Sequence, residues 1–235
     1  MDEGPRYGVY FVPTPQSELY RFGSAVLGYD CYSGAALDFR RECKAAVSDW
    51  MAITDEPRRY GFHATLKAPF RLSPDCAEAS LVGAVQNLAR LGHAVPVIAP
   101  VIDIVSGFGA VVPSRPEPAL DALANACTTI LDAYRAPMSP QERARRLAQG
   151  LNAHQLENLD RWGYPFVFSE FRFRMTLTGR LKPDRQKATL ALLRKCFERA
   201  CSDRTVPVDR LALVKQDTAQ TPFRVIHVAP LKTAA

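Results

Sequence analysis

The chain has 235 residues, of which 47% are hydrophobic and 23% are charged, and its formal net charge is +6. This composition predicts an ordinary soluble globular protein with a large core, arranged as one or two domains. No run approaches the roughly 20 apolar residues of a membrane span, and the first five residues lack the basic and apolar segments of a secretory signal. We therefore expect a cytoplasmic protein with no membrane contact, whose mild positive charge suits an anionic partner.

The first half of the chain predicts strands and helices in alternation. Period-two patterns of apolar and β-branched residues indicate the strands, apolar residues three and four apart indicate the helices, and proline or glycine stands at several boundaries. The expected strands cover residues 6–12 and 60–70, followed by a pair within 95–112. The expected helices begin at Ser17 and Asp75, and a further helical stretch covers about 36–51.

The second half repeats this rhythm. A helix is expected over about 118–134, then a strand over 166–181, a helix after Pro183, and two strands over 206–214 and 223–228. Between the first two of these, residues 137–165 carry no strand signal and predict a pair of short helices. We interpret that region as an insert, a candidate for a lid or a family-specific arm.

Each half thus places a strand before a helix and two further strands, which indicates an internal repeat of elements. We expect a single bilobal domain of the α+β class over residues 1–235, with the helical insert at about 137–165. Two mostly antiparallel sheets should face a central cleft, with helices on their outer sides.

A short pattern marks the equivalent strand of each half: Phe62-His63-Ala64-Thr65-Leu66 and Phe173-Arg174-Met175-Thr176-Leu177. Because side chains alternate along a strand, one polar row is expected in each copy. If a pseudo-twofold axis relates the lobes, the two rows meet across the cleft and suit a phosphate. The rows are Gly61, His63, Thr65 and Lys67 in the first copy, and Arg172, Arg174, Thr176 and Thr178 in the second.

The segments 59–70 and 171–179 resemble the paired motifs of the 2H phosphoesterases, relatives of the 2′-5′ RNA ligase and cyclic phosphodiesterase enzymes. Over nearly its whole length the chain is similar to a bacterial phosphonate-metabolism branch of that superfamily. The resemblance implies a bilobal fold, no metal, no cofactor and hydrolysis of a phosphodiester. One histidine would accept a proton from water, a second would protonate the leaving oxygen, and the threonines would hold the phosphoryl oxygens.

Carried over residue by residue, the resemblance makes His63 a proton-transfer group and Thr65 and Thr176 phosphate ligands. Arg174 stands where the second motif has histidine. A guanidinium, with a pKa above about 12, transfers no proton near neutral pH, but it can bind phosphate and stabilise developing charge. Loss of one acid or base typically removes about 10² to 10⁴ in rate, so we expect weakened hydrolysis with retained phosphate binding.

Further candidates and one alternative remain. Lys67, Arg172 and Tyr60 are expected to bind substrate, although solvent would satisfy the two cations as well, and Tyr60 needs a local twist to reach the site. The substrate is expected to be a small phosphate ester or a nucleotide, such as a ribose cyclic phosphate, and RNA is a further possible partner. The alternative is a catalytically impaired protein that binds phosphate ligands or RNA.

The remaining histidines and the cysteines predict no second site. We expect His93 at a helix end or at the surface, and His154 in a polar helical stretch without a functional role. His227 is the one other histidine that could reach the cleft as a substitute proton donor. The six cysteines form no C-x-x-C pair. Buried thiols therefore explain them better than disulfides or metal ligands.

Overall fold

A computed structural model describes residues 4–92, 94–148 and 150–232. Within these residues, no helix has the length and apolar character needed to cross a bilayer. All six cysteines are unpaired, and five of them are buried, as expected. His93, which we expected at a helix end or at the surface, lies outside the described residues.

The first half contains most of the expected elements. The side chain of Ser17 caps the first helix by accepting a hydrogen bond from the Tyr20 amide, and Pro118 occupies the first turn of the last. The strands are β1 (Arg6–Phe11), β2 (Ala64–Arg71), β3 (Val97–Ile98), β4 (Pro100–Val105) and β5 (Phe108–Pro113). The helices are α1 (Glu18–Leu27), α2 (Arg41–Ala46), α3 (Trp50–Ile53), α4 (Asp55–Arg58), α5 (Glu78–Ala89) and α6 (Pro118–Leu131).

The expected helical stretch over 36–51 is wrong in its extent. Its first residues are held extended, because the amides of Leu37 and Arg40 donate to carbonyls at the end of α1. A new helix then begins at Trp50, whose fully buried indole donates to the Val26 carbonyl at 2.9 Å. These tertiary contacts override the local helical pattern and leave two short helices, α2 and the start of α3, within the stretch.

The second half opens with the 3₁₀ turn η1 (Asp132–Tyr134) and closes with three strands. Residues 137–165 contain two short helices, and each begins with a capping box. The helices are α7 (Pro140–Leu147), α8 (Ala153–Trp162) and α9 (Pro183–Ala200), with the 3₁₀ turn η2 (Phe168–Glu170) after α8. The strands are β6 (Met175–Arg180), β7 (Val206–Pro207), β8 (Arg210–Gln216) and β9 (Arg224–Pro230).

The α+β class and the antiparallel pairing are confirmed. Across the described residues, seven strands follow the order β4-β5-β6-β2-β1-β8-β9, and the neighbouring strands pair antiparallel. β2 and β6 are joined through a single pair, Ala64 with Met175. The two expected sheets are therefore continuous at this one point, with three strands on one side of it and four on the other.

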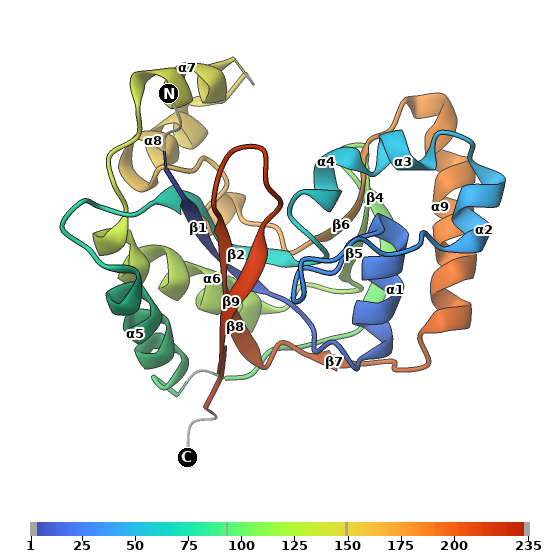
Figure 1. Ribbon diagram of the computed structural model, residues 1–235, viewed down its shortest axis with the longest axis horizontal. Helices are drawn as coiled ribbons and strands as arrows, with labels where there is room; N and C mark the ends of the chain where they lie inside the picture. The colour runs from blue at the N-terminus through green and yellow to red at the C-terminus, as the bar shows by residue number, and fades with distance from the viewer. Residues whose placement is uncertain (1–3, 93, 149, 233–235) are drawn as a thin grey trace.

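Each lobe combines strands from both halves of the chain. The motif strand β2 shares its lobe with the C-terminal hairpin β8–β9, whereas β6 shares its lobe with β4–β5. Helices α5 and α6 cover the first lobe, and α1 and α9 cover the second, so the two groups lie at opposite ends of the molecule (Figure 1). Strands from the two halves also pair directly, as β2 with β6 and as β3 with β7.

Candidate functional site

A glycine turn positions His63 immediately before β2. We expected the strand to include residues 60–63, but Gly61 has φ +73°, a left-handed conformation that L-residues rarely adopt. A Cβ at this position would lie 2.5 Å from Cys31 Cβ, so the turn requires glycine on steric grounds as well. The Gly61 carbonyl faces the imidazole and is 2.9 Å from His63 Nδ1.

These contacts define the protonation pattern of His63. A carbonyl oxygen can only accept, so Nδ1 carries the proton and donates to Gly61. In the neutral ring, Nε2 is then the acceptor, and it faces the Thr65 hydroxyl at 3.2 Å. The ring also stacks on Tyr10, with centroids 3.8 Å apart and planes at 21°. The imidazole is thus held in one orientation with Nε2 as its basic atom.

The environment of His63 favours the neutral ring. Desolvation of the half-buried side chain lowers its pKa from 6.5 to about 4, the bond to the Gly61 carbonyl opposes this, and the charge of Arg174 adds to the lowering. At neutral pH the imidazole is therefore unprotonated. It is arranged to accept a proton rather than to donate one.

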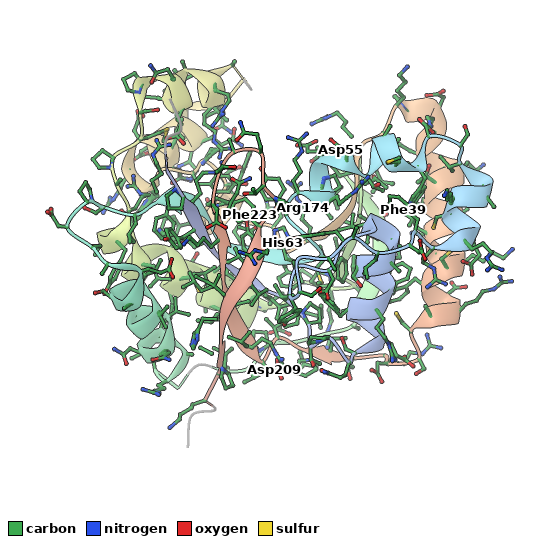
Figure 2. The ribbon with its side chains drawn as sticks, in the orientation of Figure 1. Phe39, Asp55, His63, Arg174, Asp209 and Phe223 are labelled. Carbon is green, nitrogen blue, oxygen red and sulfur yellow. The ribbon has the colours of Figure 1, made fainter. Side chains whose placement is uncertain are left out.

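Arg174 immediately precedes β6, and Thr176 lies within it. Ala64 and Met175, which join β2 to β6, are fully buried, so their neighbours along the strands project from the opposite face of the sheet. Figure 2 shows His63 and Arg174 near the centre of the molecule, between the two groups of helices. The influence of Arg174 on the pKa of His63 agrees with this convergence.

Arg174 and Thr176 are less constrained than His63. The Arg174 guanidinium lies over the Phe108 ring, 5.5 Å from its centroid. Within residues 4–92, 94–148 and 150–232, its side chain forms no hydrogen bond or ion pair, and neither does the Thr176 hydroxyl. Both side chains are half-buried. A cation and a hydroxyl are therefore available for an anion that approaches this face.

Tyr60 lies beside His63. The left-handed turn at Gly61 supplies the twist that an uninterrupted strand would have lacked. The Tyr60 and His63 ring centroids are 6.2 Å apart, and Tyr60 stacks on Phe223 with centroids at 5.3 Å. Tyr60 therefore belongs to an aromatic wall on one side of the imidazole.

The expected position of Lys67 on the His63 face is wrong. The β1–β2 register shifts between Val9, which pairs with Lys67, and Tyr10, which pairs with Thr65. Because paired residues share a face and strand neighbours do not, this irregularity turns Lys67 away from His63. Its buried ammonium donates to Asp132 at 3.2 Å and to a carbonyl of α6. Its charge is already paired on the helical side of the sheet.

Arg172 is also directed elsewhere. Its side chain is exposed and donates to the carbonyls of Ser169 and Phe171, at 2.8 and 2.6 Å, in and beside η2. The expected strand over 166–181 begins only at Met175, so strand alternation does not apply at position 172. The structure therefore does not group Arg172 with Arg174.

The other histidines lie apart from this site. His227 pairs with Leu213, which pairs with Val9, and its ring nitrogen contacts Gln86 of α5 at 3.2 Å. It therefore lies on the helical face, opposite Tyr10 and His63. His154 lies in α8, is exposed and contacts Ser169.

Sequence reasoning missed four residues around the motif side chains. Tyr10 stacks on His63, and Phe223 stacks on Tyr60. Arg6 lies over the Phe223 ring at 5.5 Å. Burial raises the pKa of Tyr164, and Arg174 is close enough for its charge to oppose this rise. Side chains alternate along β1, so the sequence pattern alone places Arg6, Gly8 and Tyr10 on one face. What the sequence lacked was any sign that this face adjoins the motif.

The arrangement combines a neutral proton acceptor, an unpaired guanidinium and two hydroxyls on one face of the sheet. This set suits a tetrahedral oxyanion, which takes hydrogen bonds from arginine and threonine. Across the described parts of the chain, no three histidine, cysteine or carboxylate side chains are grouped so that they could hold a metal ion.

Comparisons with known proteins find one matching family model and two longer relatives. A family model described as "Protein of unknown function (DUF1045)" matches residues 65–224. A protein named Ribose 1,5-bisphosphate phosphokinase PhnN from Laribacter hongkongensis (strain HLHK9) is 34% identical over 230 residues, which are 97% of this chain and 52% of the relative. A protein of the same name from Janthinobacterium sp. (strain Marseille) is 32% identical over 93% of this chain and 49% of its own length. The chain spans about half the length of these curated relatives.

Among solved structures, the chain is similar to Usb1 of Kluyveromyces marxianus. The match has 11% sequence identity and a TM-score of 0.36, and it covers 98% of this chain and 99% of the other. A likeness at this level carries no conclusion about activity.

Proposed function

The chain belongs to the DUF1045 family, whose description assigns no function, and we propose that it is a metal-independent phosphoesterase of the 2H type. The observation that carries the proposal is the convergence of His63 and Arg174 at the one point where β2 and β6 pair. A proton acceptor and a phosphate-binding cation beside two threonines are what hydrolysis of a phosphodiester requires.

In the proposed reaction, His63 Nε2 accepts a proton from the attacking water. The water oxygen bonds to phosphorus, the ester P–O bond breaks, and the leaving oxygen departs with the bonding electrons. Arg174 stabilises the charge that develops on the phosphoryl and leaving oxygens, and Thr65 and Thr176 donate to phosphoryl oxygens. Because Arg174 releases no proton, the leaving oxygen takes its proton from solvent. A cyclic phosphodiester would open to a phosphomonoester with a new hydroxyl.

The proposed substrate is a small cyclic or other phosphodiester, such as a ribose cyclic phosphate of phosphonate metabolism. The name of the two longer relatives, which refers to a phosphorylated ribose, supports this class. Six unpaired cysteines support a reducing compartment, the cytoplasm, as the place where the protein works.

The test measures hydrolysis of a 2′,3′-cyclic nucleotide in the presence of a chelator. The native chain should release product, and His63→Gln should lower the rate by about 10² to 10⁴. Thermal unfolding of both proteins controls for loss of the fold. Turnover that survives in His63→Gln, or that the chelator abolishes, would contradict the proposal.

Arg174→His provides a second arm, because it restores the residue that the 2H motif predicts. If arginine only replaces a lost acid, the histidine variant should hydrolyse the nucleotide faster than the native chain. An unchanged or lower rate would show that Arg174 has its own part in the reaction.

The second candidate function is a binding protein for phosphate ligands or RNA. It is favoured by Arg174, which transfers no proton, and by the low pKa of His63, about 4, which makes the imidazole a weak base. Saturable binding of the cyclic nucleotide without turnover would support this function over the first.

A further inference from the structure

A hollow lined by arginines lies beside the proposed site. It encloses about 420 Å³ of space that opens to solvent, between the start of β1, the end of β2 and the region of α7 and α8. We call it the arginine hollow. Its charged lining residues are Arg6, Arg71, Arg135, Arg146 and Glu142.

Two of these four arginines have a carboxylate partner. Arg71 pairs with Glu142, and Arg135 pairs with Asp132 at 2.8 Å. Arg6 instead contacts the neutral amide of Gln216. Arg146 lies over the Tyr164 ring, 5.3 Å from its centroid, and has no carboxylate partner within the described residues. Two half-buried positive charges are therefore left for an anion.

Aromatic side chains connect the arginine hollow to both motif strands. Phe223, which lies under Arg6, stacks on Tyr60, and its ring is 6.2 Å from Tyr10, the stacking partner of His63. Burial raises the pKa of Tyr164, which lies under Arg146, and the charges of Arg146 and Arg174 both oppose this rise, so Tyr164 is near both arginines. Each of the two arginines is thus close to one half of the proposed site.

Tyr10 lies between Arg6 and His63, because it shares its face of β1 with Arg6 and its ring stacks on His63. Tyr10 is fully buried, and its hydroxyl forms no hydrogen bond within the described residues. A Cβ on Gly8 would lie 3.0 Å from Tyr10 Cε1, so the ring leans back along β1 toward Arg6.

The spacing suits one small molecule. Arg6 and Tyr10 are four residues apart on β1, about 13 Å between their Cα atoms at roughly 3.3 Å per residue. Both side chains reduce that separation, because the Tyr10 ring leans toward Arg6 and the arginine extends over Phe223. A nucleotide-sized molecule spans a distance of this order.

We infer that Arg6 and Arg146 form a second anion subsite, which binds a phosphomonoester carried by the same substrate whose phosphodiester lies at His63 and Arg174. This inference rests on the proposed function and narrows its substrate to molecules with two phosphate groups. It also gives a role to the 137–165 region, which contributes Arg146 and Tyr164.

Calorimetric titration tests the subsite without relying on turnover. The probes are adenosine 3′,5′-bisphosphate and adenosine 3′-monophosphate, which differ by one phosphomonoester. The bisphosphate should bind the native chain about 10- to 100-fold more tightly, the range for one charge-assisted contact. In Arg146→Ala and in Arg6→Gln, this ratio of dissociation constants should fall toward one.

Arg145→Ala is the matched control. Arg145 is the neighbour of Arg146 on α7, is exposed and does not line the hollow, so its removal changes net charge equally and should leave the ratio intact. Equal affinities for the two probes, or no measurable binding of the bisphosphate, would overturn the subsite. Tighter binding of an RNA oligonucleotide than of the bisphosphate would also overturn it, in favour of a surface for diester phosphates.

Turnover of a 2′,3′-cyclic nucleotide, measured on the same samples, separates the two proposals. An Arg146-dependent ratio without turnover would contradict the phosphoesterase and leave the subsite standing. Turnover together with a ratio of one would support the phosphoesterase and contradict the subsite.

Discussion

The turn before β2 and the segment before β6 occupy equivalent places in the two halves of the fold, yet they hold their side chains differently. His63 is fixed by the Gly61 carbonyl, the Thr65 hydroxyl and the Tyr10 ring. Arg174 contacts the Phe108 ring and has no hydrogen bond within the described residues. A base must meet its proton at a defined atom, whereas a guanidinium can adapt to an anion from several directions. The contrast matches the roles proposed for the two residues.

Removing the arginine gives the largest expected effect on this comparison. Arg174→Ala should lower kcat/KM for a 2′,3′-cyclic nucleotide by about 10² to 10³, the usual cost of one group that stabilises transition-state charge. Arg180→Ala is the control, because Arg180 lies over the same Phe108 ring at 5.2 Å but is exposed. Equal losses in the two variants would mean that net charge, rather than the position of Arg174, supports the reaction.

A second test uses pH, because only one of the two motif residues titrates. The pKa of His63 is about 4 in the folded chain and near 6.5 when unfolded, so between these values the unfolded state binds a proton that the folded state does not. The free energy of unfolding should therefore fall as pH decreases from 6.5 toward 4, by at most about 3 kcal/mol, and the loss should be complete below pH 4.

Denaturant unfolding at pH 6.5 and pH 5 would measure this difference while most carboxylates stay ionised. His63→Gln should reduce the decrease in stability over that interval, and Arg180→Ala should not. An identical decrease in the native chain and in His63→Gln would show that the folded ring titrates normally.

The smallest of the three expected effects comes from the turn itself. Gly61→Ala forces an L-residue into a left-handed conformation, which costs about 1 to 2 kcal/mol, and it brings a methyl group against Cys31. Thermal unfolding should shift down by several degrees. Gly83→Ala in α5 is the matched control, since a Cβ there meets nothing within 4 Å. If Gly61→Ala unfolded at as high a temperature as Gly83→Ala, the glycine would not be what fixes His63.

Much of the element order could be predicted from the sequence, because its signals are local. Ser17 caps α1 and Pro183 opens α9, as the pattern indicated. The separate helices over 36–51 could not be predicted, since contacts with α1 decide them. The position of Lys67 depends on a register shift against β1, which no pattern within β2 records.

The candidate site was predictable only in part, for the same reason. The motif located His63, Thr65, Arg174 and Thr176, because repetition and resemblance can be read from the sequence alone. Tyr10, Arg6 and Tyr164 enter through pairing and packing between distant segments. The residues next to them in the sequence do not resemble the motif. Sequence reasoning therefore identified the residues proposed to react and missed these residues proposed to surround them.

The C-terminal hairpin β8–β9 completes the lobe that contains β1 and β2, and this has a consequence for folding during synthesis of the chain. Arg6 bonds to Gln216, which is 210 positions away, and β1 lies between β2 and β8. While the ribosome is still adding the last strands, β1 therefore has one edge without its native partner, and such edges invite aggregation. Contacts this distant also slow folding. The nascent chain can complete neither the lobe that holds His63 nor the proposed anion subsite until synthesis of β8 is finished.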